Sequence, residues 1–328
     1  MQLEITHETH YSYQPVVETA LHVAHLRPPS TAHQQLLSHT LAIDPVPSQL
    51  TQSLDVYGNL CSFFELQAVH EELSVVARSL VRTSVPDWPT SAITWEQVRE
   101  RFRYRAGAGF NAASEFVFAS PYVPRHPDFL AYAKPSFGPG VPLLAAAQNL
   151  MERIYGDFTY SSESTEISTP AVEALALRKG VCQDFAHIMV ACCRAMGLPA
   201  RYVSGYLLTH PAPGQPRLIG SDASHAWASV YVPDQPGDLG WSDFDPTNNR
   251  APGEDYITLA TGRDYSDVSP MRGVIHGGAR HILSVAVTVM PLDPVAPPPP
   301  ARTSQTGDSQ SQSQSQSSIW QPALQQWQ

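Results

Sequence analysis

The first eighty or so residues alternate between two kinds of side chain with the period of two that half-buried strands show. Over residues 4–13, one face would carry Ile, His, Thr and two Tyr side chains, and the other Glu, Thr, Glu, His and Ser. Further strands are predicted at 16–27, 36–44, 49–57, 59–67 and 72–82. We therefore expect an antiparallel, β-sandwich-like domain over residues 1–84.

A helix signal and then a run of prolines occupy residues 85–142. Thr94 and Gln97 have the spacing of a capping box, which predicts a helix that continues through Arg103. Six prolines lie between residues 121 and 142, and this density is typical of a segment without regular structure. We interpret residues 85–142 as a helical and proline-rich connector.

From Leu143 onward the chain has the pattern of helices packed on an antiparallel sheet. Helices are predicted at 143–155, from Pro170 onward and at 182–196. Strands are predicted at 200–208, 224–232, 241–245 and 280–290. These elements define a core over residues 143–293 and an α+β fold class. Residues 294–328 are rich in Pro, Ser and Gln, so they are predicted to be a disordered tail.

Cys182 stands at the head of the helix predicted at 182–196. A side chain in the first turn of a helix faces unpaired backbone N–H groups and the positive end of the helix dipole, which favour the nucleophilic thiolate. The alternative is that Cys182 is a small core residue, as buried cysteines usually are. Asp184 and His187 follow at positions that turn them away from the thiol, so we expect them to anchor the helix to neighbouring loops.

His225 and Asp245 lie on two of the later strands. A helix with a cysteine, a strand with a histidine and a strand with an aspartate can supply a nucleophile, a base and a group that orients the base. Each residue alone has a structural explanation, but the three together are less readily explained by chance. Asp243 precedes Asp245 by two residues and would share its face of the strand, so either carboxylate could reach His225.

Three segments around these residues, GVCQDFAH, SHAWASVYVP and GWSDFDPTNN, resemble the transglutaminase-like superfamily of papain-type folds, in its bacterial branch. The segments HETHYSYQPVVETALHVAHLRP and DVYGN resemble the N-terminal β-domain of that branch, and GRDYSDVSPMRGVIHGG resembles its C-terminal segment. The resemblance implies that Cys182 is the nucleophile, His225 the base and Asp245 the orienting carboxylate, since Asp245 matches the family's Asp-Pro-Thr position.

The chemistry expected from this set is acyl transfer on an amide bond through a thioester, with a peptide or protein as the substrate. Hydrolysis is favoured, because the sequence has no EF-hand-like calcium loop and no evident export signal. The alternatives are a protein-glutamine transglutaminase that uses an amine acceptor, and a non-catalytic peptide-binding module. Tyr160, Trp227 and Trp241 are candidates to line the cleft.

The composition of the chain limits which classes of partner and which cellular compartment we expect. A net charge of −10 with only 20 Lys and Arg residues argues against nucleic acid as a partner. No apolar run approaches membrane-spanning length and no signal peptide is visible, so we expect a cytoplasmic protein with no membrane partner. The four cysteines do not have the spacing of a disulfide framework, which suits a reducing compartment. The sequence gives no indication of the oligomeric state.

Several histidines fall in the predicted β-domain: His7, His10, His22 and His25. A spacing of three on a strand points two side chains to opposite faces, and no cysteine or carboxylate pair adjoins them in the sequence. We therefore expect no metal site and no cofactor.

Overall fold

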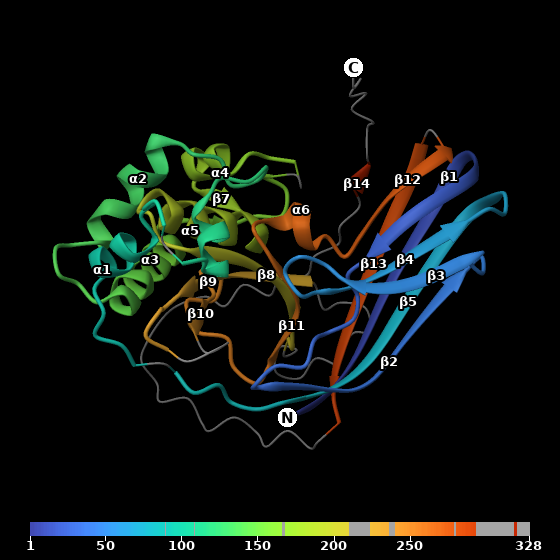
Figure 1. Ribbon diagram of the computed structural model, residues 1–328. Coiled ribbons are helices and arrows are strands. Elements are labelled where there is room, and N and C mark those ends of the chain that lie inside the picture. Colours follow the sequence, from blue (N-terminus) through green and yellow to red (C-terminus); the bar gives the residue numbers. More distant parts are fainter. Residues whose placement is uncertain are drawn as a thin grey trace, which may run out of the picture.

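The computed structural model describes residues 1–88, 90–107, 109–165, 168–209, 224–235, 240–278 and 280–292, with the backbone of residues 318–319. Most of the predicted disordered tail at 294–328 lies outside the described residues. In the parts that are described, no helix is long and apolar enough to cross a membrane. A large antiparallel sheet stands beside a layer of helices packed on a smaller sheet (Figure 1).

The larger sheet is built on one long strand, β1, which spans Gln2–Ala24. Its other N-terminal strands are β2 (Gln34–Asp44), β3 (Gln49–Leu54), β4 (Leu60–Leu66) and β5 (His70–Thr83). β1 buries alternate side chains from Leu3 to Thr9, as the alternation in the sequence predicts. The strands expected at the start of the chain and at 16–27 are one continuous strand, whose pairing with β5 shifts register between Ser12 and Val17.

Two later strands, and a two-residue segment β14 (Ser318–Ile319) that pairs with one of them, complete this sheet. β12 (Met271–Gly277) pairs with the second half of β1, and β13 (Arg280–Pro291) pairs with the first half, from Leu3 opposite Pro291 to Gln14 opposite Arg280. In Figure 1 both lie alongside β1. The strand predicted at 280–290 exists, but our placement of it in the helix-against-sheet core was wrong. A strand's sequence specifies its buried face and not the partner at its edge.

The helical layer surrounds α5 (Cys182–Ala195), which is buried on nearly every face. Helix α5 packs against the smaller sheet on one side and against α2, α3 and α4 on the other. The helical elements are α1 (Trp95–Phe102), η1 (Ala112–Val117), α2 (Pro127–Ala133), η2 (Lys134–Ser136), α3 (Leu143–Asp157), α4 (Ala171–Leu177) and α6 (Tyr265–Val268). The predicted capping box is confirmed, since Thr94 and Gln97 cap α1 reciprocally. Connector residues such as Val123 and Phe129 belong to the same apolar core as α5.

The smaller sheet is antiparallel, in the order β10-β9-β8-β11. Its strands are β8 (Ala200–Leu207), β9 (Ser224–Tyr231), β10 (Trp241–Phe244) and β11 (Tyr256–Gly262). The first three were predicted, whereas β11 was not. Two short segments, β6 (Thr159–Tyr160) and β7 (Lys179–Gly180), pair in parallel just before α5.

An apolar cluster joins the two sheets. Leu3, Ile5, Val287 and Val289 from the larger sheet are buried against a second group from β8, the residue after it and β11. This second group consists of Tyr206, Leu208, Ile257 and Leu259. Because β13 supplies two of the first group, it helps to hold the larger sheet against the core.

Removing β12 and β13 should therefore disrupt folding, because β1 would keep β5 and β4 but lose the strands that pair with its other edge, together with part of the buried cluster. We expect a chain that ends at residue 269 to be insoluble or to unfold without cooperativity. A chain that ends at residue 292 is the matched control, and its melting temperature should stay within a few degrees of that of the full chain. Circular dichroism melts compare the three. A cooperative, unchanged melt of the shorter chain would contradict this account of the sheet.

Candidate active site

The start of α5 is fixed by a carboxylate that caps it. Asp184 Oδ2 accepts hydrogen bonds from the backbone N–H of Val181 at 2.8 Å and from Thr165 Oγ1 at 2.7 Å. A Cβ atom on Gly180 would lie 2.5 Å from that same oxygen, so only glycine fits there. These contacts place Cys182 in the first turn, with its side chain 8% exposed.

His225 projects from β9 and connects the thiol to a carboxylate. Its Nε2 lies 2.7 Å from Asp245 Oδ2, and its side chain also hydrogen bonds with Cys182. Since Nε2 is occupied by Asp245, Nδ1 is the ring nitrogen left for the thiol. The structure thus brings together Cys182, His225 and Asp245, the three residues that the sequence singles out.

The carboxylate of Asp245 accepts hydrogen bonds from several surrounding donors. Besides His225, its Oδ2 accepts from the Tyr256 hydroxyl and from Asn248 Nδ2, both at 2.7 Å, and its Oδ1 accepts from the backbone N–H of Thr247 at 2.8 Å. The side chain of Asp245 is 0% exposed. A buried carboxylate is tolerated when its lone pairs are satisfied in this way.

Tyr256 and Asn248 belong to the candidate site through their hydrogen bonds to Asp245, and the sequence reasoning did not identify them. Asn248 lies inside the quoted segment GWSDFDPTNN, so that segment carried a signal for it. Tyr256 begins β11, a strand that was not predicted, and nothing local in the sequence indicated that its hydroxyl would reach Asp245.

The charges of the pair stabilise each other. Burial disfavours the imidazolium, but the Asp245 carboxylate and its hydrogen bond, with a smaller contribution from Cys182, more than offset this and raise the pKa of His225. Burial would raise the pKa of Asp245, but the charge of His225 and the hydrogen bonds from His225, Tyr256 and Asn248 lower it instead. The site therefore favours a protonated His225 beside an ionised Asp245 at neutral pH.

The neighbouring carboxylate has a different partner. Asp243 Oδ2 accepts a hydrogen bond from the indole Nε1 of Trp227 at 3.1 Å. Trp227 is fully buried, and its ring packs edge-on against Tyr256. Of the two candidates, Asp245 is the carboxylate that contacts His225, while Asp243 holds an aromatic side chain behind the site.

The other residues proposed for the site divide into two groups. Tyr160 lies near Cys182, which adds to burial in raising the pKa of the phenol, and Trp227 lies next to His225, with ring centroids 6.1 Å apart. Trp241 instead pairs with Tyr231 at the far end of β9 and packs on Phe116, so it does not line the thiol.

Asp184 and His187 act as anchors, as their positions in the sequence predict. The Nε2 of His187 accepts from the backbone N–H of Tyr265 at 3.2 Å, and its ring lies against Tyr122 and Tyr202. Burial lowers the pKa of His187 to about 3, so this histidine is neutral. Neither residue is within the hydrogen-bonded set around the thiol.

A cavity of about 450 Å³ opens at the opposite end of α5, lined among others by His126, Arg194 and Gly197. α5 has 14 residues, so this cavity lies about 20 Å along the helix from Cys182. It is separate from the reactive groups, and we do not assign the chemistry to it.

Comparisons with known proteins show the family to which the chain belongs. Residues 3–82 match the family model for the bacterial transglutaminase-like N-terminal region, and residues 131–246 match the model for the transglutaminase-like superfamily. An uncharacterized protein from Mycobacterium tuberculosis (strain H37Rv) is 42% identical over 299 residues, which are 88% of this chain and 92% of the relative. A protein-glutamine gamma-glutamyltransferase from Pseudomonas aeruginosa is 39% identical over 77 residues, which are 23% of this chain and 11% of that protein.

Among solved structures, a candidate cysteine protease from Cytophaga hutchinsonii aligns with a TM-score of 0.68 at 22% sequence identity, covering 91% of this chain and 93% of that chain. The chain belongs to the transglutaminase-like superfamily. The expected α+β fold with a transglutaminase-like core is confirmed. Membership in this superfamily supports cysteine-based catalysis in general.

The four cysteines should differ widely in reactivity. Cys61, Cys192 and Cys193 are at most 2% exposed, and burial raises the pKa of Cys192 and Cys193. Cys182 is the thiol that hydrogen bonds with a histidine of raised pKa. We expect substoichiometric iodoacetamide to label Cys182 more than about tenfold faster than the others, and His225→Ala to remove that advantage. Peptide mapping measures each site, and equal labelling of all four thiols in folded protein would contradict the assignment.

Proposed function

We propose that the protein is a cysteine hydrolase that cleaves amide bonds of peptides or proteins, with Cys182 as nucleophile, His225 as acid and base, and Asp245 as the orienting carboxylate. The observation that carries the proposal is the position of His225, between a fully buried carboxylate and a thiol at the start of a helix. This is the order of contacts that nucleophilic catalysis requires.

Acylation would begin from a Cys182 thiolate beside a protonated His225. The thiolate sulfur attacks the amide carbonyl carbon, and the C–N bond breaks as the leaving nitrogen takes the proton from His225 Nδ1. The product is a thioester on Cys182 and a free amine. The backbone N–H of Cys182, at the open end of α5, is the available donor for the oxyanion.

Deacylation would return the protein to its starting state. Neutral His225 takes a proton from water, the hydroxide oxygen attacks the thioester carbon, and the C–S bond breaks to release the acid and the thiolate. Asp245 stays ionised throughout and keeps Nε2–H pointed at itself, so Nδ1 remains directed at the reacting atoms.

Water is the acceptor that we favour. Hydrolysis needs no second binding site, whereas transfer to an amine needs a site that binds the amine and excludes water. The printed description of the structurally similar Cytophaga hutchinsonii protein as a candidate cysteine protease supports hydrolysis. The local similarity to a protein-glutamine gamma-glutamyltransferase makes amine transfer the second candidate.

The two neighbouring carboxylates should contribute unequally to turnover. Asp245→Asn removes the charge that orients His225 and stabilises its protonated form, so we expect a loss of about 10²- to 10⁴-fold. Asp243→Asn keeps an oxygen that accepts from the Trp227 indole, so its loss should stay below about tenfold, or ~1.4 kcal/mol. Hydrolysis of p-nitrophenyl acetate measures both variants. A greater loss at Asp243 would reverse the assignment.

The same variants should differ in pH dependence. A raised pKa means that His225 keeps its proton as the pH rises past 6.5, so the limb of the activity profile that reports loss of this proton should lie on the alkaline side of neutral. Without the charge of Asp245, His225 loses its proton at a lower pH. The alkaline limb of the kcat/KM profile of Asp245→Asn should therefore shift to lower pH. Asp243→Asn is the control, in which the limb should not move.

The acceptor can be identified from product partition. We expect the acetyl-enzyme formed from p-nitrophenyl acetate to yield mainly acetate, even when a lysine ester is present at millimolar concentration. Mass spectrometry of the products gives the ratio of acetate to acetylated amine. A predominance of the amide product would move the assignment from hydrolase to transglutaminase, while leaving the nucleophile unchanged.

A further inference from the structure

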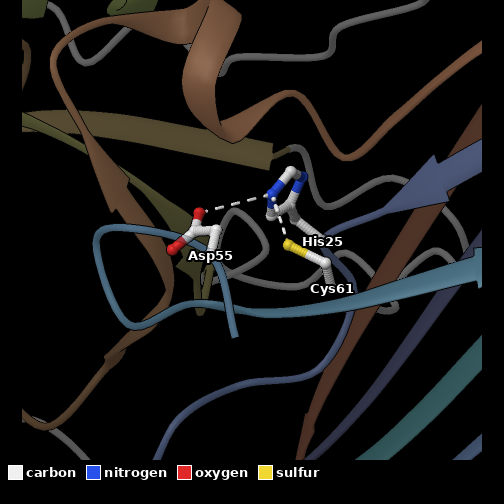
Figure 2. Close-up of side chains that lie close together, drawn as sticks. All are labelled: His25, Asp55 and Cys61. Atoms are coloured by element: carbon white, nitrogen blue, oxygen red, sulfur yellow. Dashed lines mark hydrogen bonds and ion pairs between the residues drawn. The ribbon is translucent and has the colours of Figure 1, made fainter. Parts of the chain in front are cut away.

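A second group of cysteine, histidine and aspartate side chains lies in the β-domain, away from α5. Cys61 Sγ is 3.1 Å from His25 Nε2, and Asp55 Oδ2 is 3.7 Å from the same nitrogen. Figure 2 shows the three side chains pointing toward one another. The three ligand atoms lie within 4.8 Å of one another. The sequence-based expectation overlooked this group, because its members come from segments up to 36 residues apart.

The register of three strands creates the group. His25 directly follows β1, and Asp55 directly follows β3. Cys61 lies on β4, whose next residue, Ser62, pairs with Ala24 at the end of β1. The turn between β3 and β4 is tight because Asp55 Oδ1 accepts from two backbone N–H groups within it. The three side chains are therefore held by regular structure.

The group differs from the candidate active site in one decisive respect. His225 uses one nitrogen for the carboxylate and leaves the other for the thiol, which allows a proton to be relayed. His25 presents the same nitrogen, Nε2, to both Cys61 and Asp55, so it cannot be oriented by one and act on the other. Three ligand atoms that converge on one point are instead the geometry of a metal site.

The remaining ring nitrogen of His25 supports this. Nδ1 lies 3.0 Å from the backbone carbonyl oxygen of Ser269, so it is the nitrogen that carries the proton and donates. Nε2 is then unprotonated, and its lone pair faces Cys61 and Asp55. Histidines that ligate metals almost always donate their other N–H to a carbonyl or carboxylate, which fixes the ring.

Donor types and spacings indicate the ion. Thiolate, imidazole and carboxylate are the ligands of zinc, at about 2.3, 2.0 and 2.1 Å from the metal, and two such ligands of a tetrahedral site lie about 3.4–3.6 Å apart. The distances of 3.1 and 3.7 Å lie on either side of that spacing. We propose that His25, Asp55 and Cys61 bind one zinc-class divalent cation, with the fourth position open to water along the partly exposed side of Asp55.

A cation here would join the β-domain to the core. Ser269, which holds His25, lies between α6 and β12. Asn59, which donates to Asp55 Oδ2, also exchanges hydrogen bonds with the backbone N–H and carbonyl of Thr261 on β11. The expected consequence of binding is stability, because an ion that binds the folded chain alone shifts the folding equilibrium. This inference does not depend on the proposed hydrolase activity.

The test uses the Cys182→Ser chain, so that the active-site thiol cannot bind the metal. Metal-free, reduced protein is titrated with Co²⁺, which reports a thiolate ligand through a sulfur-to-cobalt charge-transfer band, and zinc is then added to displace it. We expect one equivalent of each metal and a rise of several degrees in melting temperature with zinc. Absence of both the band and the shift would overturn the proposal without bearing on the hydrolase assignment.

Added substitutions locate the ion. In the same background, Cys61→Ala should abolish the charge-transfer band, and His25→Gln should weaken zinc binding by more than about tenfold. Cys192→Ala is the matched control, since it removes a buried thiol on α5 and should leave the band and the stoichiometry intact. Retention of the band in a folded Cys61→Ala protein would also overturn the proposal. If a substituted chain fails to fold, the titration of the Cys182→Ser chain, in which the cluster is unaltered, still tests whether the cation binds.

Discussion

The hydrogen bond between His225 Nε2 and Asp245 Oδ2 is the contact on which the candidate site depends. Both side chains are removed from solvent, and an ion pair is stable there only if its other hydrogen-bonding groups are satisfied. Tyr256, Asn248 and the backbone of Thr247 meet that requirement for the carboxylate. The residues that follow β10 must therefore lie beside the start of β11, where Tyr256 donates to Asp245. The fixed carboxylate in turn directs Nδ1 of His225 at the thiol. The arrangement of the smaller sheet and the orientation of His225 therefore depend on the same contacts.

Local patterns made much of the fold predictable. α5 has apolar residues at helical spacing and a Gly-Leu-Pro stop at 197–199, so both its extent and the position of Cys182 followed from nearby residues. His225 and Asp245 followed from the order of strands and from the family's motifs. Tyr256 could not be found in this way, because its contact with Asp245 depends on how a short, unpredicted strand returns to the sheet. Trp241 was misplaced for a related reason, since its position at one end of β10 depends on register with β9.

Pairing between distant segments is also what the sequence left open in the β-domain. The alternation in β1 specifies a buried face, but the partners at its edges, β5, β12 and β13, come from both ends of the described chain. The same strand register brings His25 and Cys61 together, so the two clusters of cysteine, histidine and aspartate arise from different sheets. They also differ in chemistry. In one, the histidine separates the thiol from the carboxylate and can relay a proton; in the other, all three groups face a common point.

The central claim is that the Cys182 sulfur carries the acyl group during turnover. The most direct measurement is intact-mass analysis of protein that has been quenched in acid during reaction with p-nitrophenyl acetate, followed by peptide mapping of the adduct. The account predicts a single acetyl group on Cys182, which disappears as substrate is exhausted and accumulates in Asp245→Asn if deacylation is slowed. An acetyl group on another residue, or turnover that persists in Cys182→Ala, would contradict it.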